Sequence, residues 1–122
     1  MKQVQTEKAP KAVGPYSQAI VSGGFAFCSG QLGIGENGAL GDGIESQTEN
    51  AIKNLSAVLL AAGSSLDLVV KTTCFLANIS DFAAFNEVYG KFFTAKPARS
   101  LIEAAALPKG SLDEIEAIAE IR

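Results

Sequence analysis

The sequence has no histidine among its 122 residues. This absence excludes Ser-His-Asp and Cys-His catalysis, together with every metal site that needs a histidine ligand. Any chemistry must therefore come from arginine, lysine, glutamate, aspartate, tyrosine, serine, cysteine or the backbone.

Cysteine is also scarce. Cys28 and Cys74 are the only two, they lie far apart in apolar runs, and they form no Cys-x-x-Cys pair. Two such residues do not make a disulfide framework, so we expect two reduced cysteines in the core. The first residues lack the apolar core of a signal peptide, and no apolar run is long enough to span a bilayer. These features predict a soluble, cytoplasmic protein.

Basic residues are few. The chain has 10 Lys and Arg against 13 Asp and Glu, a net charge of −3 and a pI near 4.9. Binding to nucleic acid or to an anionic membrane needs a basic patch or stripe, and the sequence has neither. We therefore expect no nucleic acid and no membrane as a partner.

The composition is that of a globular domain. Hydrophobic residues make up 48% of the chain and charged residues 19%, and there is no repeat, low-complexity segment or linker. Residues 1–122 are therefore predicted to form one domain. The mean hydropathy of +0.22 is high for so short a chain. It fits a well-packed monomer and an oligomer that buries apolar surface between subunits equally well.

Hydrophobic periodicity predicts two helices. Apolar residues recur at helical spacing over 44–62, where Asp42 and Glu45 suggest a capping box and Gly63 a C-terminal stop. Asp81 is the expected N-cap of a second helix, which carries an aromatic face and ends before Pro97. That face comprises Phe82, Phe85, Tyr89, Phe92 and Phe93.

Other segments predict strands. β-branched and alternating residues mark five of them, and Pro and Gly mark the turns between them. The clearest is the last, where apolar residues alternate with mostly charged ones. Residues 1–13 are expected to form an edge strand or an arm, and 33–43 a glycine-rich loop. The predicted strands cover 17–22, 24–31, 69–77, 98–107 and 114–122.

This order of elements, ββ-α-β-α-ββ, predicts an α+β fold in which two helices cover one face of a mixed sheet. The opposite face has no element left to cover it. Small residues are plentiful on the strands, among them Ala104, Ala106, Ala117 and Ala119. A second apolar face of this kind favours an oligomer.

Without histidine, two charged residues at strand starts are the strongest candidates for chemistry. Arg99 is either a solvated charge or an anchor for a carboxylate, which its planar guanidinium grips with two hydrogen bonds. Glu114 is either a surface carboxylate or a general acid/base that acts through a water molecule. From the residues alone, both interpretations stay open at each position.

Three further polar positions have structural as well as functional interpretations. Tyr16 sits where a loop meets a strand, a usual place for a packing aromatic. Ser29 lies within a strand, where most serines bond to the backbone. Asn86 shares a helical face with Phe82 and Tyr89, so its amide needs a partner if it is buried.

Taken together and in this order, these segments resemble the reactive-intermediate deaminases, the RidA/YjgF family. The resemblance runs from near Gln5 to the C-terminus and therefore covers almost the whole chain. Its most specific part is the tandem of Pro-Ala-Arg-Ser and Glu-Ile-Glu-Ala-Ile-Ala. The matching segments are GPYSQA (14–19), SGQ (29–31), the stretch 82–89, PARS (97–100), LPK (107–109) and EIEAIA (114–119).

The resemblance implies a chorismate-mutase-like α+β fold and a homotrimer with active sites in clefts between subunits. It implies hydrolysis of 2-imino acids and enamines, such as 2-iminobutanoate and 2-iminopropanoate, to 2-oxo acids and ammonia. The implied partner is a small imino or oxo acid, and the implied reaction needs no cofactor and no metal.

By the same resemblance, Arg99 binds the substrate carboxylate and Glu114 positions or activates water. The side chains of Tyr16, Ser29 and Asn86 are expected to line the cleft. The family also implies a role for the backbone at two further positions of the cleft. These are Gly30, which can donate to the ligand, and Leu101.

Two positions depart from the pattern of the family. Leu101 stands where many deaminating members have cysteine, directly after the Arg-Ser pair. Because the family uses the backbone there, this exchange is expected to change the shape of the pocket more than the chemistry. The stretch 94–96 is shorter than in the best-known members, which bears on substrate range.

Two other functions are alternatives to the deaminase. A non-catalytic trimer that binds 2-oxo acids or other carboxylates needs Arg99 but has no need of Glu114. An RNA-cleaving role is disfavoured by the low pI, the lack of a basic stripe and the lack of histidine for acid/base work on a phosphodiester.

Overall fold

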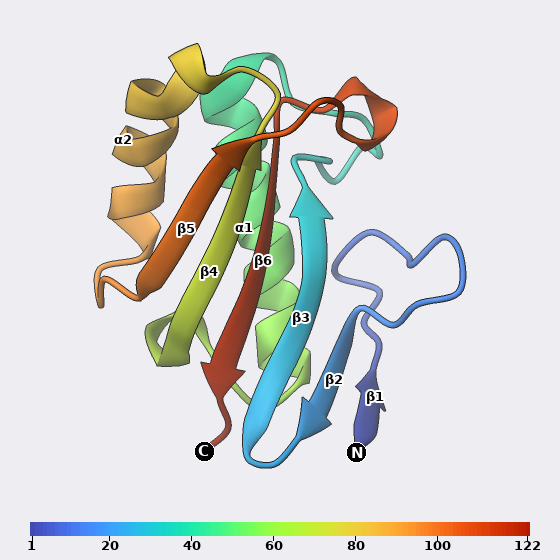
Figure 1. Cartoon of the computed structure of the whole chain (residues 1–122). Helices are drawn as coiled ribbons and strands as arrows, with labels where there is room; N and C mark the ends of the chain where they lie inside the picture. The colour runs from blue at the N-terminus through green and yellow to red at the C-terminus, as the bar shows by residue number, and fades with distance from the viewer.

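A mixed sheet of six strands forms one layer of the molecule (Figure 1). The computed structural model describes residues 1–122, and the strands follow the spatial order β1-β2-β3-β6-β4-β5. Only β4 and β5 pair in parallel, and every other neighbouring pair is antiparallel. The strands are β1 (Lys2–Val4), β2 (Ala19–Ser22), β3 (Phe25–Leu32), β4 (Val69–Leu76), β5 (Ala98–Glu103) and β6 (Asp113–Glu120).

Two helices form the second layer, α1 (Gly43–Ala61) and α2 (Phe82–Phe92). Both lie on the same side of the sheet, as Figure 1 shows, and α1 packs on β3, β6 and α2. The predicted α+β architecture with two helices on one face is therefore confirmed. Neither helix combines the length and apolar character needed to cross a membrane.

The core lies between the sheet and the helices. The apolar positions of β6 that alternate along the sequence, Ile115, Ala117 and Ala119, all point toward it and are buried. Cys28 and Cys74 are buried there as free thiols, as predicted. The largest apolar side chains that fill the core are Phe85, Ile52, Leu55, Leu59, Leu76 and Val58.

The strand β5 is shorter than predicted and ends at Glu103 rather than at residue 107. Its partner β4 ends at Leu76, and the last backbone bond between these segments runs from the Ala104 amide to the Leu76 carbonyl, at 2.8 Å. Residues beyond this point have no strand beside them, so they cannot continue the ladder. The other predicted strands agree with the structure within two residues.

The helix caps differ from the prediction. Asp42 precedes α1 but its side chain makes no capping bond, and the chain enters the helix through Gly43 at a φ of +86°. Asp81 makes no capping bond either, because a short 3₁₀ turn, Ile79–Asp81, precedes α2. The capping residue is instead Asn78, whose side chain accepts a bond from the Ser80 amide at 3.0 Å.

The sheet face opposite the helices has no covering element in the chain. The alanines expected there lie elsewhere: Ala117 and Ala119 face the helices, and Ala104 and Ala106 lie beyond β5. Aromatic and aliphatic side chains occupy that face instead, and three are well exposed: Phe25, Phe27 and Ile102. The N-terminal strand β1 pairs with β2 at the sheet edge, as expected for residues 1–13.

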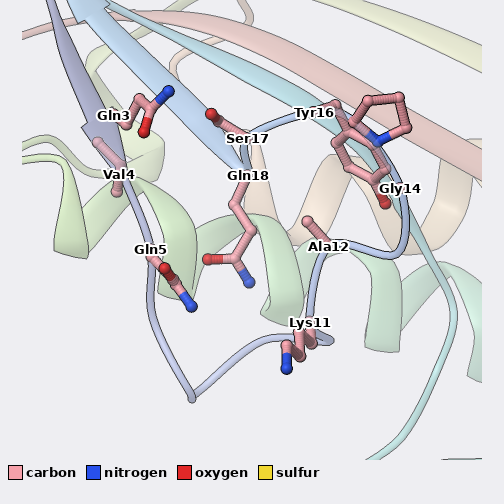
Figure 2. Close-up of a pocket in the computed structure, with 10 residues that line it drawn as sticks. Gln3, Val4, Gln5, Lys11, Ala12, Gly14, Tyr16, Ser17 and Gln18 are labelled. Atoms are coloured by element: carbon pink, nitrogen blue, oxygen red, sulfur yellow. The ribbon is translucent and has the colours of Figure 1, made fainter.

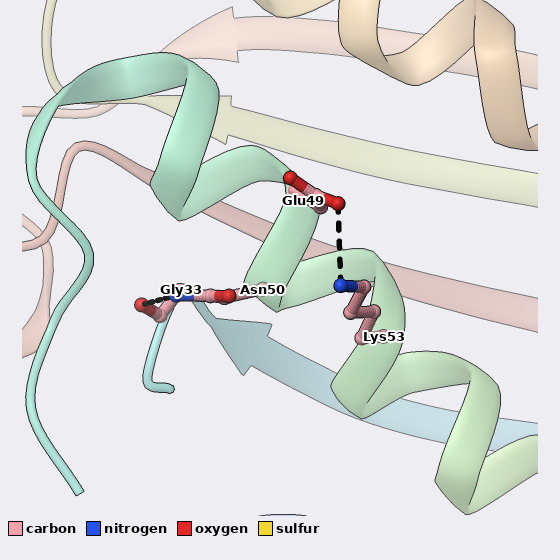
Figure 3. Close-up of polar contacts among 4 residues, drawn as sticks. All are labelled: Gly33, Glu49, Asn50 and Lys53. Carbon is pink, nitrogen blue, oxygen red and sulfur yellow. Dashed lines mark hydrogen bonds and ion pairs between the residues drawn. The ribbon is translucent and has the colours of Figure 1, made fainter. Parts of the chain in front are cut away.

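The loop between β3 and α1 is held by asparagine side chains of α1. Asn54 donates to the carbonyls of Leu32 and Ile34, and Asn50 donates to that of Gly33 (Figure 3). Figure 3 also shows the Lys53–Glu49 ion pair of 3.2 Å, which is solvent-exposed and contributes little to stability. The asparagine bonds fix the end of β3, where the candidate site begins.

Candidate active site

Arg99 lies near the start of β5 on the face of the sheet that carries the helices. It pairs in register with the buried Thr72 of β4, so its side chain points toward α2. There its guanidinium Nη1 donates to the Asn86 Oδ1 at 2.7 Å. This bond is the partner that the Asn86 amide was expected to need, and it joins the two residues in one group.

Aromatic rings of α2 support the same guanidinium. The Arg99 Cζ lies 4.9 Å from the centre of the Tyr89 ring and 5.8 Å from that of Phe82. The Tyr89 ring stacks on Phe93 at 4.3 Å, and its hydroxyl shares a hydrogen bond of 2.7 Å with Thr72. Burial raises the pKa of the Tyr89 hydroxyl above its usual value, so it stays neutral. The rings therefore orient Arg99 without neutralising its charge.

No carboxylate forms an ion pair with Arg99, although its side chain is partly buried. The guanidinium has donors left after its bond to Asn86, so its free edge is suited to an anionic ligand. The group opens onto a hollow next to α2. It is lined by Tyr89, Gly90, Phe93, Thr94, Lys96, Pro97 and Arg99.

Glu114 lies on the opposite face of the sheet, next to Gly30 of β3. The ladder between β3 and β6 shifts its register between Cys28 and Gln31, so the two strands are irregular at this point. Gly30 is so close to Glu114 that a Cβ at this glycine would overlap the carboxylate. Both residues line a hollow with Tyr16, beside the turn that contains Lys109.

The environment of Glu114 favours its protonated form. Burial raises the pKa of this carboxyl above its usual value, and the charge of Glu116, two residues along the same face of β6, raises it further. A carboxylate with a raised pKa is a stronger base than an exposed glutamate. Glu114 therefore has the character of a general acid/base.

A Gly30→Ala variant tests whether this close approach positions Glu114. The added methyl group must displace the carboxylate, and we expect kcat for the reaction proposed below to fall by about tenfold or more. Thermal unfolding of the variant checks that the fold is kept. Gly24→Ala is unsuitable as a control because Gly24 has a φ of +84°, and Gly90→Ala is unsuitable because Gly90 lines the hollow beside Arg99. Gly35→Ala is the control, because Gly35 lines neither hollow and its added Cβ would lie 3.3 Å from the nearest atom, the Asn37 Oδ1. An unchanged kcat in Gly30→Ala would show that the close approach has no catalytic role.

The segment that carries Tyr16 is fixed by Gln18. The Gln18 side chain accepts a bond from the Thr6 amide at 2.7 Å and donates to the carbonyls of Thr6 and Pro10. Figure 2 shows this side chain directed into the loop, between Gln5 and Lys11. The Tyr16 hydroxyl accepts a weak bond from the Val13 amide at 3.4 Å, and its ring remains about half exposed. The loop thus forms one wall of the hollow that contains Glu114.

Two other predicted residues have mainly structural contacts within one chain. The Ser29 hydroxyl donates to the Ser17 carbonyl at 2.6 Å and joins β3 to the Tyr16 segment. The Leu101 side chain packs against the hydrophobic core, so neither hollow contains it. Sequence reasoning did not single out Gln18 or the left-handed backbone of Lys96 and Lys109, at φ of 54° and 59°.

The predicted residues thus form two groups. Arg99 and Asn86 lie beside α2, whereas Tyr16, Gly30 and Glu114 lie on the uncovered side of the sheet. The structure of one chain does not bring these two groups together. A single ligand can contact both only if a second copy of the chain places its own group opposite.

Comparison with known proteins places this chain in a family. The profile of the family described as endoribonuclease L-PSP matches residues 6–121. The chain belongs to this family. Reactive Intermediate Deaminase A of Arabidopsis thaliana is 49% identical over 121 residues, which cover 97% of this chain and 65% of the plant protein. The human 2-iminobutanoate/2-iminopropanoate deaminase is 44% identical over 119 residues, which cover 95% of this chain and 87% of the human one.

Solved structures of similar proteins share the fold of this chain. The structure of E. coli TdcF with bound serine superposes with a TM-score of 0.95, is 37% identical in sequence, and covers 100% of each chain. The family profile and the relatives named as deaminases confirm the resemblance to the RidA/YjgF proteins inferred from the sequence. The comparisons show that the chain belongs to the L-PSP family and has its α+β fold.

Proposed function

We propose that this protein hydrolyses reactive 2-imino acids and their enamines to 2-oxo acids and ammonia. The observation that carries the proposal is the Arg99 guanidinium, which Asn86 and Tyr89 orient but no carboxylate neutralises. Such a group suits a small ligand with a carboxylate. Membership of a family that includes proteins named as imine deaminases supplies the reaction.

The chemistry requires only groups of this chain and water. Arg99 holds the carboxylate of a 2-imino acid, with roughly 1.5–3 kcal/mol for each charge-assisted hydrogen bond. Glu114, as a carboxylate, takes a proton from water while the hydroxide oxygen bonds to the C=N carbon. Glu114 then returns this proton to the imine nitrogen, which gives a carbinolamine. Finally the hydroxyl proton passes through Glu114 to the amino nitrogen as the C–N bond breaks, and ammonia and the 2-oxo acid result.

A homotrimer is part of the proposal. The two groups of site residues lie on opposite faces of the sheet, so the site is incomplete within one chain. The uncovered face with Phe25, Phe27 and Ile102 gives a second subunit apolar surface to bury. We propose that Arg99 of one subunit faces Glu114 of the next across each interface, in the cytoplasm of the cell.

The proposal is tested by competition for a freshly formed imine. An amino-acid oxidase generates the 2-imino acid, semicarbazide traps it, and the protein is added in increasing amounts. We expect the wild type to suppress semicarbazone formation. In Arg99→Lys the charge remains but the two-pronged grip is lost, so KM should rise by about 10- to 100-fold with a smaller change in kcat.

The chain offers a matched control for this variant. Its only other arginine, Arg122, is exposed at the C-terminus and pairs loosely with Glu120 at 3.9 Å. Arg122→Lys should therefore leave KM unchanged. If the wild type fails to alter trapping with imines of several side-chain sizes, the deaminase proposal is wrong. Equal KM values in the wild type and Arg99→Lys would instead remove Arg99 from the site.

The second candidate function is a binder of small carboxylates without turnover. The bound serine in E. coli TdcF supports it, because it shows that a relative with the same fold takes a small amino acid. Arg99 serves both candidates, so only the role of Glu114 separates them. Binding of 2-oxobutyrate by calorimetry without any effect on semicarbazone formation would favour the binder.

RNA cleavage, to which the name of the family refers, fits this chain less well. The chain has a net charge of −3 and no histidine. The hollow at Glu114 offers only Tyr16 and lysine side chains as a second acid/base beside this carboxyl. Phosphodiester cleavage would need strong positive charge along the path of the RNA.

A further inference from the structure

Asp113, the first residue of β6, is a buried acid without a partner. Its side chain is 0% exposed, and neither carboxyl oxygen has a hydrogen-bond partner. The hydroxyl of Ser111, two residues earlier, is also buried and unpartnered. Buried carboxyls are normally paired with a cation or with several donors, because an isolated buried charge is unstable. Asp113 is thus stable in this place only as the neutral acid.

The surroundings of Asp113 contain no cation to hold its charge. On α1, the Thr48 hydroxyl lies close enough to lower the pKa, but it donates its own hydrogen bond to the Ile44 carbonyl at 2.7 Å. On β4, the Cys74 thiol has its pKa raised to about 11 by burial and is neutral. Along β6, Glu114 adds a negative charge. Burial, followed by this charge, raises the pKa of Asp113 to about 7.

The position of Asp113 is independent of any second subunit. The residue alternates with Glu114 along β6 and therefore points toward α1, with Ile115 and Ala117. This face is covered by the helices of the same chain, so a neighbouring copy cannot supply a partner. Proton binding at this carboxyl is consequently a property of the single domain.

The backbone next to Asp113 is held at two points. The Leu112 amide donates to the Gln47 Oε1 at 2.8 Å, and the Leu112 carbonyl accepts from the Ala77 amide at 3.0 Å. Glu114 follows directly and projects to the opposite face, beside Gly30. Any displacement of Asp113 therefore moves Glu114 as well.

We propose that Asp113 is a positioning residue for Glu114. While it carries a proton, its carboxyl packs beneath α1 and the start of β6 stays in place. When it releases the proton to solvent, the charged carboxylate must reach water, and residues 111–114 separate from α1 and carry Glu114 away from Gly30. The effect on catalysis rests on the proposed function, whereas the displacement of this segment does not.

Hydrogen exchange tests the displacement without reference to activity. In the wild type, the protection factors of amides 112–116 should fall by about tenfold or more between pH 6 and pH 8.5, while those of 51–59 in α1 stay constant. Asp113→Asn and Asp113→Val cannot ionise, so both should keep the same protection at both pH values. Asp67→Asn, at an exposed acid, should behave like the wild type.

The pH profile of imine hydrolysis tests the expected effect of this displacement on catalysis. We expect the wild-type kcat to fall at least about threefold from pH 6.5 to 8.5, and the fall to disappear in Asp113→Asn or Asp113→Val. Constant protection of 112–116 in the wild type, or an alkaline fall that both variants retain, would overturn the proposal. If the protein hydrolyses no imine but exchange at 112–116 follows Asp113, the proposed function fails while the pH-dependent displacement stands.

Discussion

Replacing Glu114 with glutamine is expected to reduce kcat for imine hydrolysis by about 100- to 10,000-fold, the usual contribution of a general acid/base. The amide has the shape of the carboxyl, and it keeps the contact with Gly30. It cannot take a proton from water, so the attacking hydroxide is no longer formed. Affinity for 2-oxobutyrate should change no more than a few-fold. The carboxylate of this ligand is held by Arg99, which belongs to the other group of site residues.

The pH dependence of the hydrolysis rate follows from the same carboxyl, that of Glu114. Glu114 must be ionised to accept a proton, and burial and the charge of Glu116 raise its pKa. The rate should therefore fall as the pH drops, with a midpoint above the ordinary glutamate value of about 4.3. Glu116→Gln removes one of the two causes and should move this midpoint to lower pH.

Kinetics and binding are measured together to separate chemistry from affinity. Semicarbazide competition gives kcat, and calorimetry with 2-oxobutyrate gives Kd. Glu120→Gln is the matched control, since Glu120 lies on the same face of β6 but faces Arg122 at the solvent-exposed end. A Glu114→Gln protein with wild-type kcat would assign the catalytic proton to another group.

The fold could be predicted from the sequence because its signals are local. Alternation along β6 and the apolar stripe of α1 depend only on which residues face the core. The end of β5 depends instead on its neighbour, because Leu76 is the last residue of β4 and pairs with Glu103. The capping predictions at Asp42 and Asp81 failed for a related reason. A capping side chain needs a particular backbone entry, and Gly43 and the turn Ile79–Asp81 change it.

The site was predictable in part. The sequence left Arg99 open between a solvated charge and an anchor, and the bond to Asn86 and the ring of Tyr89 now orient its guanidinium. Which face each residue occupies depends on strand register, which spacing alone does not give. Asp113 did leave a signal: it occupies a core position in the alternation that continues with Ile115, where an acid is out of place.

The separation of Arg99 from Glu114 leads to the second large effect, complementation between inactive subunits. Arg99→Ala lacks the carboxylate anchor, and Glu114→Gln lacks the base, so each protein alone should show only residual activity. Each nevertheless keeps the group that the other has lost. If every site takes Arg99 from one subunit and Glu114 from the next, a mixed trimer contains some complete sites.

The expected recovery follows from random assembly. The two chains are present in equal amounts. A site is complete when the subunit that supplies Arg99 is a Glu114→Gln chain and the subunit that supplies Glu114 is an Arg99→Ala chain. Each condition holds in half of the cases, so about one site in four should be complete in the whole mixture, and about one site in three in the trimers that contain both chains. The two chains are co-expressed with different affinity tags, mixed trimers are purified through both, and turnover per site is compared with the wild type.

The mixture distinguishes the two possible arrangements of the site. Were Arg99 and Glu114 of one chain to serve the same ligand, every mixed trimer would contain only defective sites, and its rate would stay at that of the separate variants. Trimers of either variant carried through the same purification give this baseline. Because the two groups lie on opposite faces of one sheet, the geometry favours recovery. Isolated mixed trimers without recovery would therefore refute the site between subunits, even if the wild type proves to be a deaminase.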